Sequence, residues 1–275
     1  MRQKDECGII FDIDHFAAHD GPGIRTVVYF KGCPLKCVWC HSPESQKKEP
    51  QMLHFKSRCK KCPVCMGDKC ANGARAVCGK LAKASELADE ISENKIFFDS
   101  SGGGATISGG EALFQPKFAI SLLALLRERK IHSIVETCGM GNWEHLREIA
   151  EYADIFYYDI KILDEKKHLI YTGAKNKTIL GNLKKLAGIS ADKITLRVPL
   201  IPGYNDFADD IAKIYDLAHG LCIRQIHLLK YNSSAPAKYE WLGLDYKPGD
   251  LKKQSEDYLG KLRKMAPKGL DVFVF

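Results

Sequence analysis

A chain of 275 residues, of which 45% are hydrophobic and 27% charged, can bury a large core as one α/β domain or as two small domains. No apolar run approaches the roughly 18 residues of a membrane-spanning helix, and no charged-then-apolar leader opens the chain, so neither a membrane span nor secretion is predicted. We therefore expect a cytoplasmic protein.

The formal net charge of +7 has two interpretations. Scattered Lys and Arg are typical of a solvated surface, whereas a basic face would suit an acidic protein, a reductant or a phosphate-bearing ligand. Nucleic-acid binding is not predicted, because the chain has no recognition-helix motif and its aromatic residues do not interleave with basic ones.

Beyond the first third of the chain, apolar runs rich in β-branched and aromatic residues alternate with amphipathic helical patterns. The expected strands are residues 26–30, 105–109, 132–137, 155–160, 194–201, 225–231 and 271–275. The expected helices are residues 86–94 behind an N-cap at Ser85, 116–130 with Pro116 in the first turn, 142–152, 178–189, 206–219 and 250–265. Six or seven βαβ units in about 250 residues predict an α/β fold, a partial (β/α)6-type TIM barrel.

Residues 46–82 interrupt this alternation. The segment is polar, cationic and rich in cysteine, and it has too few apolar residues for a core of its own. We expect a small insertion that bound metal holds together. The predicted organisation is a partial barrel made of residues 1–45 and 83–275, interrupted by this insertion.

Short polar motifs follow several of the expected strands. They are a three-cysteine loop after residues 26–30, SGGE at 108–111, ETCG at 136–139, DIK at 159–161 and LKYN at 229–232. Because the carboxyl ends of parallel barrel strands meet on one face, we expect these segments to form a single site.

Eleven cysteines are many for a chain expected in a reducing compartment, where clustered thiols more often bind metal or do redox chemistry than form disulfides. Cys7 and Cys222 stand apart from the clusters, and we expect them to be small core residues. The other cysteines lie mainly in the loop after residues 26–30 and in the insertion.

The loop holds Cys33, Cys37 and Cys40 in the spacing C-x3-C-x2-C. Three close thiolates can bind a zinc ion with one open position, or three irons of a four-iron cluster whose fourth iron is free for a small molecule. Gly32 permits close approach of the backbone, and Trp39 is placed to lie against a cluster or a flat ligand.

The pattern C-x3-C-x-aromatic-C resembles the signature of the radical S-adenosylmethionine (radical SAM) enzymes. The stretch HDGPGIRTVVYFKGCPLKCVWCHSPES (19–45) is similar to one subgroup, the activating enzymes of glycyl radical enzymes such as pyruvate formate-lyase. Further segments fit this subgroup in order: ISGGEALFQP (107–116), ETCG, YYDIKILD (157–164), HLIYTG (168–173), LRVPLIPGYND (196–206) and LLKYNSSAPAKYEWLG (228–243). The resemblance covers almost the whole chain.

The resemblance implies an oxidoreductase reaction. Cys33, Cys37 and Cys40 would ligate a [4Fe–4S] cluster, and S-adenosylmethionine (SAM) would chelate the fourth iron. One electron from the cluster cleaves the sulfonium C–S bond, and the resulting 5′-deoxyadenosyl radical takes a hydrogen atom from a glycine of the partner glycyl radical enzyme. Anaerobic life is implied, because oxygen destroys exposed clusters and glycyl radicals.

The resemblance and the chemistry of SAM together suggest which residues bind it. Gly109 and Gly110 can expose backbone groups to the methionyl amine, and Glu111 can fix their turn. Lys161 suits the carboxylate of the cofactor. Asp159 suits an ammonium group, a hydroxyl pair or a small cation, and it lies on the same side of its strand as Lys161.

Other positions match family residues directly. Glu136 and Thr137, together with Asp159, match groups that hold a monovalent cation beside the cofactor's carboxylate. Arg197 matches an arginine near the cofactor. Asn232 stands where the family has a histidine; it can hydrogen-bond an adenine or ribose group, but it cannot titrate.

Two residues concern the protein substrate. Asp20 matches a residue that holds the glycine loop of the partner, and His41 matches one near the cofactor and the substrate peptide. With Lys161 they form the predicted catalytic set.

The insertion holds a second cysteine set, Cys59, Cys62, Cys65 and Cys70, with Cys78 beyond. The spacing C-x2-C-x2-C-x4-C is close to a ferredoxin run, and the resemblance implies a ferredoxin-like insertion here. We expect one auxiliary [4Fe–4S] cluster, because two would need eight cysteines, and we favour Cys70 over Cys78 as its fourth ligand. A zinc knuckle is the alternative. The surrounding Lys and Arg would suit an acidic flavodoxin or ferredoxin as electron donor.

Two other functions fit part of the pattern. One is a radical SAM reaction on a small molecule or peptide, against which the DGPG and LRVPLIPGYND segments argue. The other is an electron carrier or a metal-dependent binding module, against which the three-cysteine loop argues, because a carrier would close its cluster with four ligands.

Overall fold

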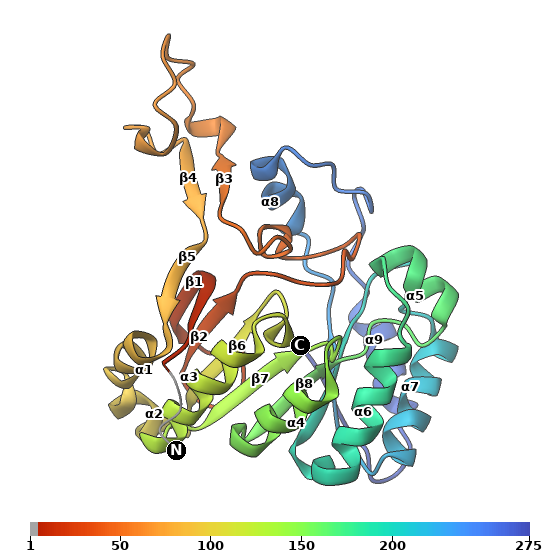
Figure 1. Ribbon diagram of the computed structural model, residues 1–275. Helices are drawn as coiled ribbons and strands as arrows, with labels where there is room; N and C mark the ends of the chain where they lie inside the picture. The colour runs from red at the N-terminus through yellow and green to blue at the C-terminus, as the bar shows by residue number, and fades with distance from the viewer. Residues whose placement is uncertain (1–4) are drawn as a thin grey trace.

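The structure is a computed structural model that describes residues 5–275. Figure 1 shows a curved sheet, with helices α3, α4 and α6 packed in front of it and a hairpin projecting from one end. The strands are β1 (Cys7–Ala17), β2 (Arg25–Phe30), β3 (Gln51–His54), β4 (Arg75–Cys78), β5 (Lys80–Lys83), β6 (Gly104–Gly109), β7 (Ser133–Thr137), β8 (Ile155–Asp159), β9 (Ile194–Pro199), β10 (Gln225–Leu229) and β11 (Asp271–Val274). The helices are α1 (Ala84–Ser92), α2 (Lys95–Ser101), α3 (Pro116–Glu128), α4 (Trp143–Tyr152), α5 (Glu165–Thr172), α6 (Lys177–Ser190), α7 (Ala208–Gly220), α8 (Ala235–Leu242) and α9 (Glu256–Lys264).

The main sheet has the order β11-β10-β9-β8-β7-β6-β2-β1-β5 among the described residues. Strand β2 and strands β6 to β11 run parallel, whereas β1 lies antiparallel between β2 and β5. Strand β11 pairs with β10 alone, so the sheet curves without closing. The α/β fold and the expected partial barrel are confirmed.

Each expected strand is present, within one or two residues of its predicted bounds. The periodic helices are also present, and α3 begins at Pro116 as expected. The helix predicted at residues 250–265 is shorter, because α9 begins only at Glu256, behind its N-cap Ser255. The prediction of Ser85 as an N-cap is wrong: α1 begins at Ala84, and the Ser85 hydroxyl instead donates to Asp5 Oδ2 over 2.7 Å.

Several elements were not predicted. Strand β1 lies before the part of the chain in which predicted strands alternate with predicted helices. Helices α5 and α8 have eight residues each, which is too short for a clear 3.6-residue period. Helix α5 is fixed by its cap instead, since Asp164 accepts the Lys167 amide over 2.7 Å.

The core fills the space between the sheet and the helices. Ile107, Phe156 and Leu196 of the strands are fully buried with Leu122 and Leu186 of the helices, and each such side chain contributes about 1.5–3 kcal/mol. No helix among residues 5–275 is both long enough and apolar enough to cross a bilayer.

The prediction that Cys7 and Cys222 are core residues is wrong, because both are exposed. Cys7 opens the strand β1, and Cys222 lies in the turn after α7 with a φ of 57°. Neither position packs against the core.

The segment predicted as an insertion projects from the sheet. Its strands β3 and β4 form a two-stranded hairpin whose cysteine-rich tip spans residues 55–74, the orange segment at the top of Figure 1. The chain then returns as β5, which pairs with β1, so residue 82 lies inside a strand of the main sheet. The division into two domains remains a prediction.

Candidate active site

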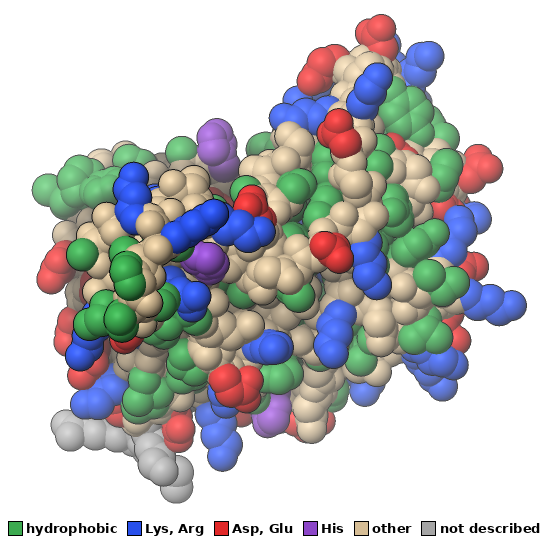
Figure 2. All heavy atoms as spheres, turned by 90° about the horizontal axis from the view of Figure 1, so that it is seen from above, with side chains coloured by type: hydrophobic (Ala, Val, Ile, Leu, Met, Phe, Trp, Pro, Cys, Tyr) green, Lys and Arg blue, Asp and Glu red, His purple; other side chains and the backbone are tan. Residues whose placement is uncertain are grey.

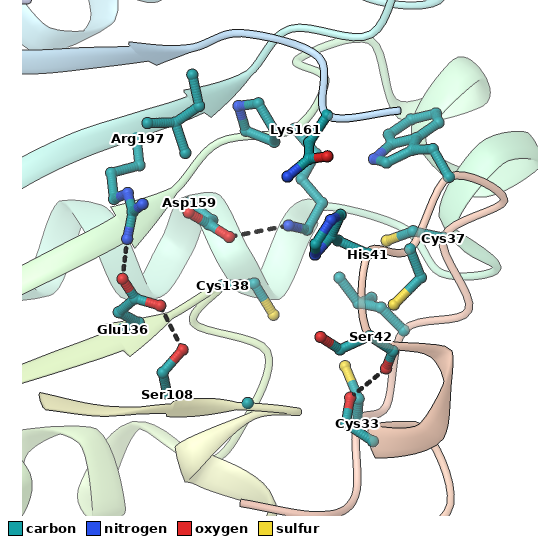
Figure 3. A pocket seen from close by; sticks show the side chains of 18 of the residues that line it. Cys33, Cys37, His41, Ser42, Ser108, Glu136, Cys138, Asp159, Lys161 and Arg197 are labelled. Atoms are coloured by element: carbon teal, nitrogen blue, oxygen red, sulfur yellow. Dashed lines mark hydrogen bonds and ion pairs between the residues drawn. The ribbon is translucent and has the colours of Figure 1, made fainter. Parts of the chain in front are cut away.

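A cavity of about 570 Å³ opens at the carboxyl ends of the parallel strands, where the sequence motifs were expected to meet. Figure 3 shows its side chains converging from the cysteine loop and from separate strands. The predicted residues that line it are Asp20, Cys33, Cys37, Trp39, Cys40, His41, Gly109, Gly110, Glu136, Thr137, Asp159, Lys161, Arg197 and Asn232.

Backbone hydrogen bonds hold the cysteine loop from two sides. The amides of Gly32 and Cys33 donate to the carbonyls of Ser45 and Gln46 over 2.6 and 3.1 Å. The Lys36 amide donates to the Thr172 carbonyl over 2.8 Å, and the neighbouring Val38 amide donates to Tyr171. The end of α5 therefore supports the loop from behind.

The three thiols of the loop are in surroundings that favour their neutral form. Burial raises the pKa of Cys33 and Cys40, and it raises the pKa of Cys37 to about 12. A metal that binds these sulfurs must displace their protons, and the positive charge of the metal then stabilises the thiolates.

The donor set fits a [4Fe–4S] cluster with one open iron. The three thiols of the loop line a cavity that has room for a further ligand, and the fourth lining cysteine, Cys138, follows β7 and is not part of the loop. The described residues contain no three His, Cys, Asp or Glu side chains placed to hold a single metal ion.

The glycines after β6 are required by close backbone approach. A Cβ on Gly109 would lie 2.5 Å from the Phe30 backbone, and one on Gly110 would lie 2.3 Å from the Gly32 carbonyl oxygen. Gly109 also has a φ of 107°. The Gly110 and Glu111 amides donate to the carbonyls of Phe30 and Gly32 over 2.8 and 2.9 Å, so this turn is anchored on the cysteine loop.

Glu111 lies beneath the cavity floor and is not among its lining residues. Its carboxylate accepts hydrogen bonds from Thr137 Oγ1 (2.6 Å) and from the amides of Leu113 (3.0 Å) and Cys138 (2.8 Å). Burial raises its pKa, although these donors oppose that shift. Glu111 thus connects the turn after β6 with the end of β7.

Two carboxylates of the cavity are paired with cations. Glu136 of β7 forms an ion pair with Arg197 of β9, and Ser108 of β6 donates a hydrogen bond to it (Figure 3). Asp159 at the end of β8 accepts from Lys161 Nζ over 2.9 Å, and the pKa of Lys161 is raised by this carboxylate against the effect of burial. The cavity therefore holds positively and negatively charged side chains in fixed positions.

The loop that carries Asp20 is held by buried polar groups. Thr106 Oγ1 donates to the Asp20 carbonyl over 2.9 Å, and it accepts from Arg25 Nε over 2.7 Å. Burial lowers the pKa of Arg25 to about 10 and raises that of Asp20. Asp20 itself faces the cavity.

The remaining wall comes from aromatic and amide groups. Trp39 packs its ring on those of Tyr171 and Tyr204, with centroids 6.0 and 5.5 Å away. His41 Nε2 lies 2.9 Å from Ser234 Oγ, which donates to Asn232 Oδ1 over 2.8 Å. Asn232 is thus connected to His41 through a serine hydroxyl.

The cysteines of the insertion lie outside this cavity. Cys59, Cys62, Cys65 and Cys70 belong to the exposed tip, whereas Cys78 is buried at the base of β4. In the register of the hairpin, Cys78 pairs with Gln51 at the end remote from the tip.

Other residues that line the cavity were not predicted from the sequence. They are His19, Tyr29, Leu35, Ser42, Ser45, Ser108, Cys138, Pro199, Ile201, Leu229, Lys230, Tyr231 and Phe275. Ser108 and Cys138 lie inside the SGGE and ETCG motifs. Their position next to predicted site residues could therefore have indicated that they line the cavity.

Comparison with known proteins gives a consistent family. Residues 27–218 match the model of the radical SAM superfamily. The trans-4-hydroxy-L-proline dehydratase activating enzyme of Clostridioides difficile is 35% identical, over 94% of this chain and 95% of its own length. The pyruvate formate-lyase 2-activating enzyme of Escherichia coli is 34% identical, over 99% and 94%.

Solved structures agree with this assignment. A domain of pyruvate-formate lyase-activating enzyme from Bacteroides vulgatus matches with a TM-score of 0.53 and 25% identity, covering 63% of this chain and 99% of that domain. A radical SAM methyltransferase from Sphaerobacter thermophilus matches with a TM-score of 0.61 over 91% of this chain and 66% of its own, but at 12% identity it shows the fold alone. The chain belongs to the radical SAM superfamily and, within it, to the activating enzymes of glycyl radical enzymes.

Proposed function

We propose that the cavity residues bind SAM against a cluster at the cysteine loop and admit a glycine of the partner protein. The enzyme is a radical SAM oxidoreductase that activates a glycyl radical enzyme. When held by Cys33, Cys37 and Cys40, a [4Fe–4S] cluster would supply the electron that breaks the sulfonium C–S bond of SAM, giving methionine and the 5′-deoxyadenosyl radical. The proposal depends above all on one observation, that the three thiols and two partly buried ion pairs line one cavity.

The polar side chains would divide the recognition of SAM among them. Lys161 is directed to the carboxylate of the methionyl group, and the backbone around Gly109 and Gly110 to its amine. Asp159 would accept a hydrogen bond from a ribose hydroxyl, and the Asn232 amide would donate to or accept from the adenine or ribose. Because Asp159 already orients Lys161 over 2.9 Å, part of the site is arranged before SAM binds.

Two residues would act on the protein substrate. Asp20 and His41 both line the cavity, where they would contact the polypeptide that carries the glycine. Arg197, paired with Glu136 in the same cavity, would lie near the cofactor.

A monovalent cation at Glu136, Thr137 and Asp159 is a further proposal. Oxygen donors of this kind suit a hard cation. Each is already engaged, however: Glu136 with Arg197, Asp159 with Lys161, and Thr137 Oγ1 with Glu111. A cation would have to displace one of these partners, and the affinity for SAM would then depend on whether Na⁺ or K⁺ is supplied.

An auxiliary [4Fe–4S] cluster in the insertion is proposed from its cysteines. Backbone amides of Ala74 and Asn72 donate to the Cys70 sulfur and lower its pKa, as they would for a bound thiolate. Cys78 lies three residues beyond Arg75 on β4, about 10 Å further from the tip. Both observations support Cys70 as the fourth ligand.

The exposed cations of the tip support an acidic electron donor of the flavodoxin or ferredoxin kind. Lys56, Arg58, Lys60, Lys61 and Lys69 are all exposed. Figure 2 looks down on the face from which the insertion projects, and Lys and Arg side chains gather left of its centre. Thiol-rich clusters of this kind persist in a reducing, oxygen-free cytoplasm, which is the location we propose.

The function is tested by anaerobic reconstitution with iron and sulfide, followed by dithionite and SAM. We expect 5′-deoxyadenosine and, after addition of a glycyl radical enzyme, the electron paramagnetic resonance (EPR) doublet of a backbone radical. A Cys37→Ala variant should give neither. Absence of 5′-deoxyadenosine from a protein that contains iron would contradict the proposal.

A further inference from the structure

A second hollow adjoins the active-site cavity. It has a volume of about 380 Å³ and is lined by Phe11, Asp12, Ile13, Asp14, His15, Tyr29, His41, Ser42 and Lys238. Tyr29, His41 and Ser42 also line the active-site cavity, so the two spaces share a wall. We call this hollow the β1 groove.

The β1 groove exists because strand β5 is short. Strand β5 pairs with β1 over Cys7–Ile10 alone, whereas β1 continues along β2 to Ala17. Within residues 5–275, the edge of β1 beyond Ile10 has no neighbouring strand on that side. An open strand edge accepts an extended polypeptide more readily than a covered one does.

Negative charge predominates in the β1 groove. Lys238 Nζ is neutralised by Glu44 at 2.7 Å, and His15 lies 3.2 Å from Glu90. Asp12 and Asp14 are exposed, and no described cation forms a salt bridge with either. Within residues 5–275, their side chains accept the nearby amides of Ile13 (2.9 Å) and Phe16 (3.3 Å). The groove is therefore acidic on a protein of net charge +7.

The two carboxylates have the spacing of a polypeptide. Asp12 and Asp14 alternate with Ile13 on one strand and lie about 7 Å apart along it. Successive same-side residues of an extended peptide have the same spacing, so two basic side chains can each meet one carboxylate. The rings of Phe11 and Tyr29, with centroids 5.5 Å apart, add an apolar wall.

We propose that the β1 groove binds an extended, basic segment of the partner protein, next to the glycine that enters the active-site cavity. The inference rests on the proposed function, because the reacting glycine belongs to a polypeptide whose flanking residues must leave the cavity. The β1 groove adjoins the cavity across His41 and Ser42, and its charge selects the side chains of the departing segment.

The test uses three synthetic peptides of eleven residues with a central glycine and two Lys, two Ser or two Glu at alternate positions on one side of it. Binding is measured by fluorescence anisotropy, without oxygen, on the reconstituted enzyme with SAM at low ionic strength. We expect the Lys peptide to bind about tenfold more tightly than the Ser peptide, and the Glu peptide to bind most weakly.

The variant Asp12→Asn/Asp14→Asn removes the charge but keeps an oxygen that can accept the amides of Ile13 and Phe16. It should abolish the preference for Lys and leave 5′-deoxyadenosine formation unchanged. The control Asp192→Asn/Asp271→Asn makes the same change of charge at exposed residues near the amino ends of β9 and β11, and it should keep the preference.

A Lys peptide that binds no better than the Ser peptide would overturn the inference, as would a preference that survives the Asp12→Asn/Asp14→Asn change. Both results are distinct from failure of the proposed function, which would appear as loss of 5′-deoxyadenosine in the unmodified enzyme.

Discussion

Glu111 and Thr137 are joined by a hydrogen bond of 2.6 Å from Oγ1 to Oε1, which connects the turn after β6 with the end of β7. Both motifs supply walls of the same cavity, and the buried carboxylate fixes their separation. The glutamate of SGGE is therefore a positioning residue that acts through Thr137 and the Cys138 amide.

Replacing Glu111 by Ala should destabilise the protein by about 3 kcal/mol, because the buried donors of Thr137, Leu113 and Cys138 lose their acceptor. Urea denaturation of the oxygen-free protein measures this free energy of unfolding. Glu128→Ala, at an exposed position of α3, should change it by less than about 0.5 kcal/mol. Equal effects of the two changes would show that Glu111 has no such role.

Lys161→Met should weaken the binding of SAM by about 10- to 100-fold, since the methionyl carboxylate loses a charged donor and Asp159 is left uncompensated nearby. The measurement is a titration of SAM followed by the change in the EPR spectrum of the reduced cluster. Iron content should be unchanged, because among residues 5–275 the Lys161 side chain donates to Asp159 and makes no hydrogen bond to the cysteine loop. Normal affinity in this variant would exclude the proposed contact.

Stability should decrease as pH falls below neutrality, partly through His227. Burial, with Arg197 as a lesser cause, lowers its pKa to about 4 from 6.5. The unfolded chain takes up a proton below pH of about 6.5, whereas the folded protein does so only near pH 4, so protonation favours unfolding between these values.

The free energy of unfolding should fall by about 1 kcal/mol less between pH 7 and 5 in the His227→Gln variant than in the unmodified protein. This figure is reduced for the partial exposure of the ring. Urea denaturation at both pH values measures the difference from the unmodified protein. The lowered pKa values of His41, His132 and His168 affect both proteins alike and cancel. Parallel pH profiles would contradict the assignment to His227.

Cys70→Ser should reduce the iron content to about half, because the auxiliary cluster loses a ligand while the cluster of the active site remains. Cys78→Ser should leave the iron content close to that of the unmodified protein, since Cys78 lies at the base of the hairpin. Iron and sulfide analysis after reconstitution compares the two. The reverse order of effects would assign the fourth ligand to Cys78.

The parallel strands could be predicted because each is a short apolar run bounded by turn residues, and the site because its motifs end those strands. Helices α5 and α8 were missed because eight residues are too few for a clear helical period. Strand β1 was missed although apolar Phe11 and Ile13 alternate with Asp12 and Asp14. The β1 groove could not be predicted from the sequence, because it results from the limited pairing of β5 with β1.

The sequence also could not predict which side chains pair with one another. Glu136 and Arg197 were each assigned to the site, but their ion pair joins residues on β7 and β9 that a third strand separates. The exposure of Cys7 and Cys222 likewise depends on which side of a strand and of a turn faces solvent. The residues next to these cysteines in the sequence do not predict that exposure.

The most direct test is EPR spectroscopy of the reduced, oxygen-free protein in which Cys59→Ser/Cys62→Ser removes the auxiliary cluster. The account predicts that one [4Fe–4S] signal remains, that SAM shifts it in a saturable titration, and that adding Cys37→Ala abolishes it. A protein that contains iron but shows no signal from the loop at residues 33–40, or whose signal does not respond to SAM, would contradict the account.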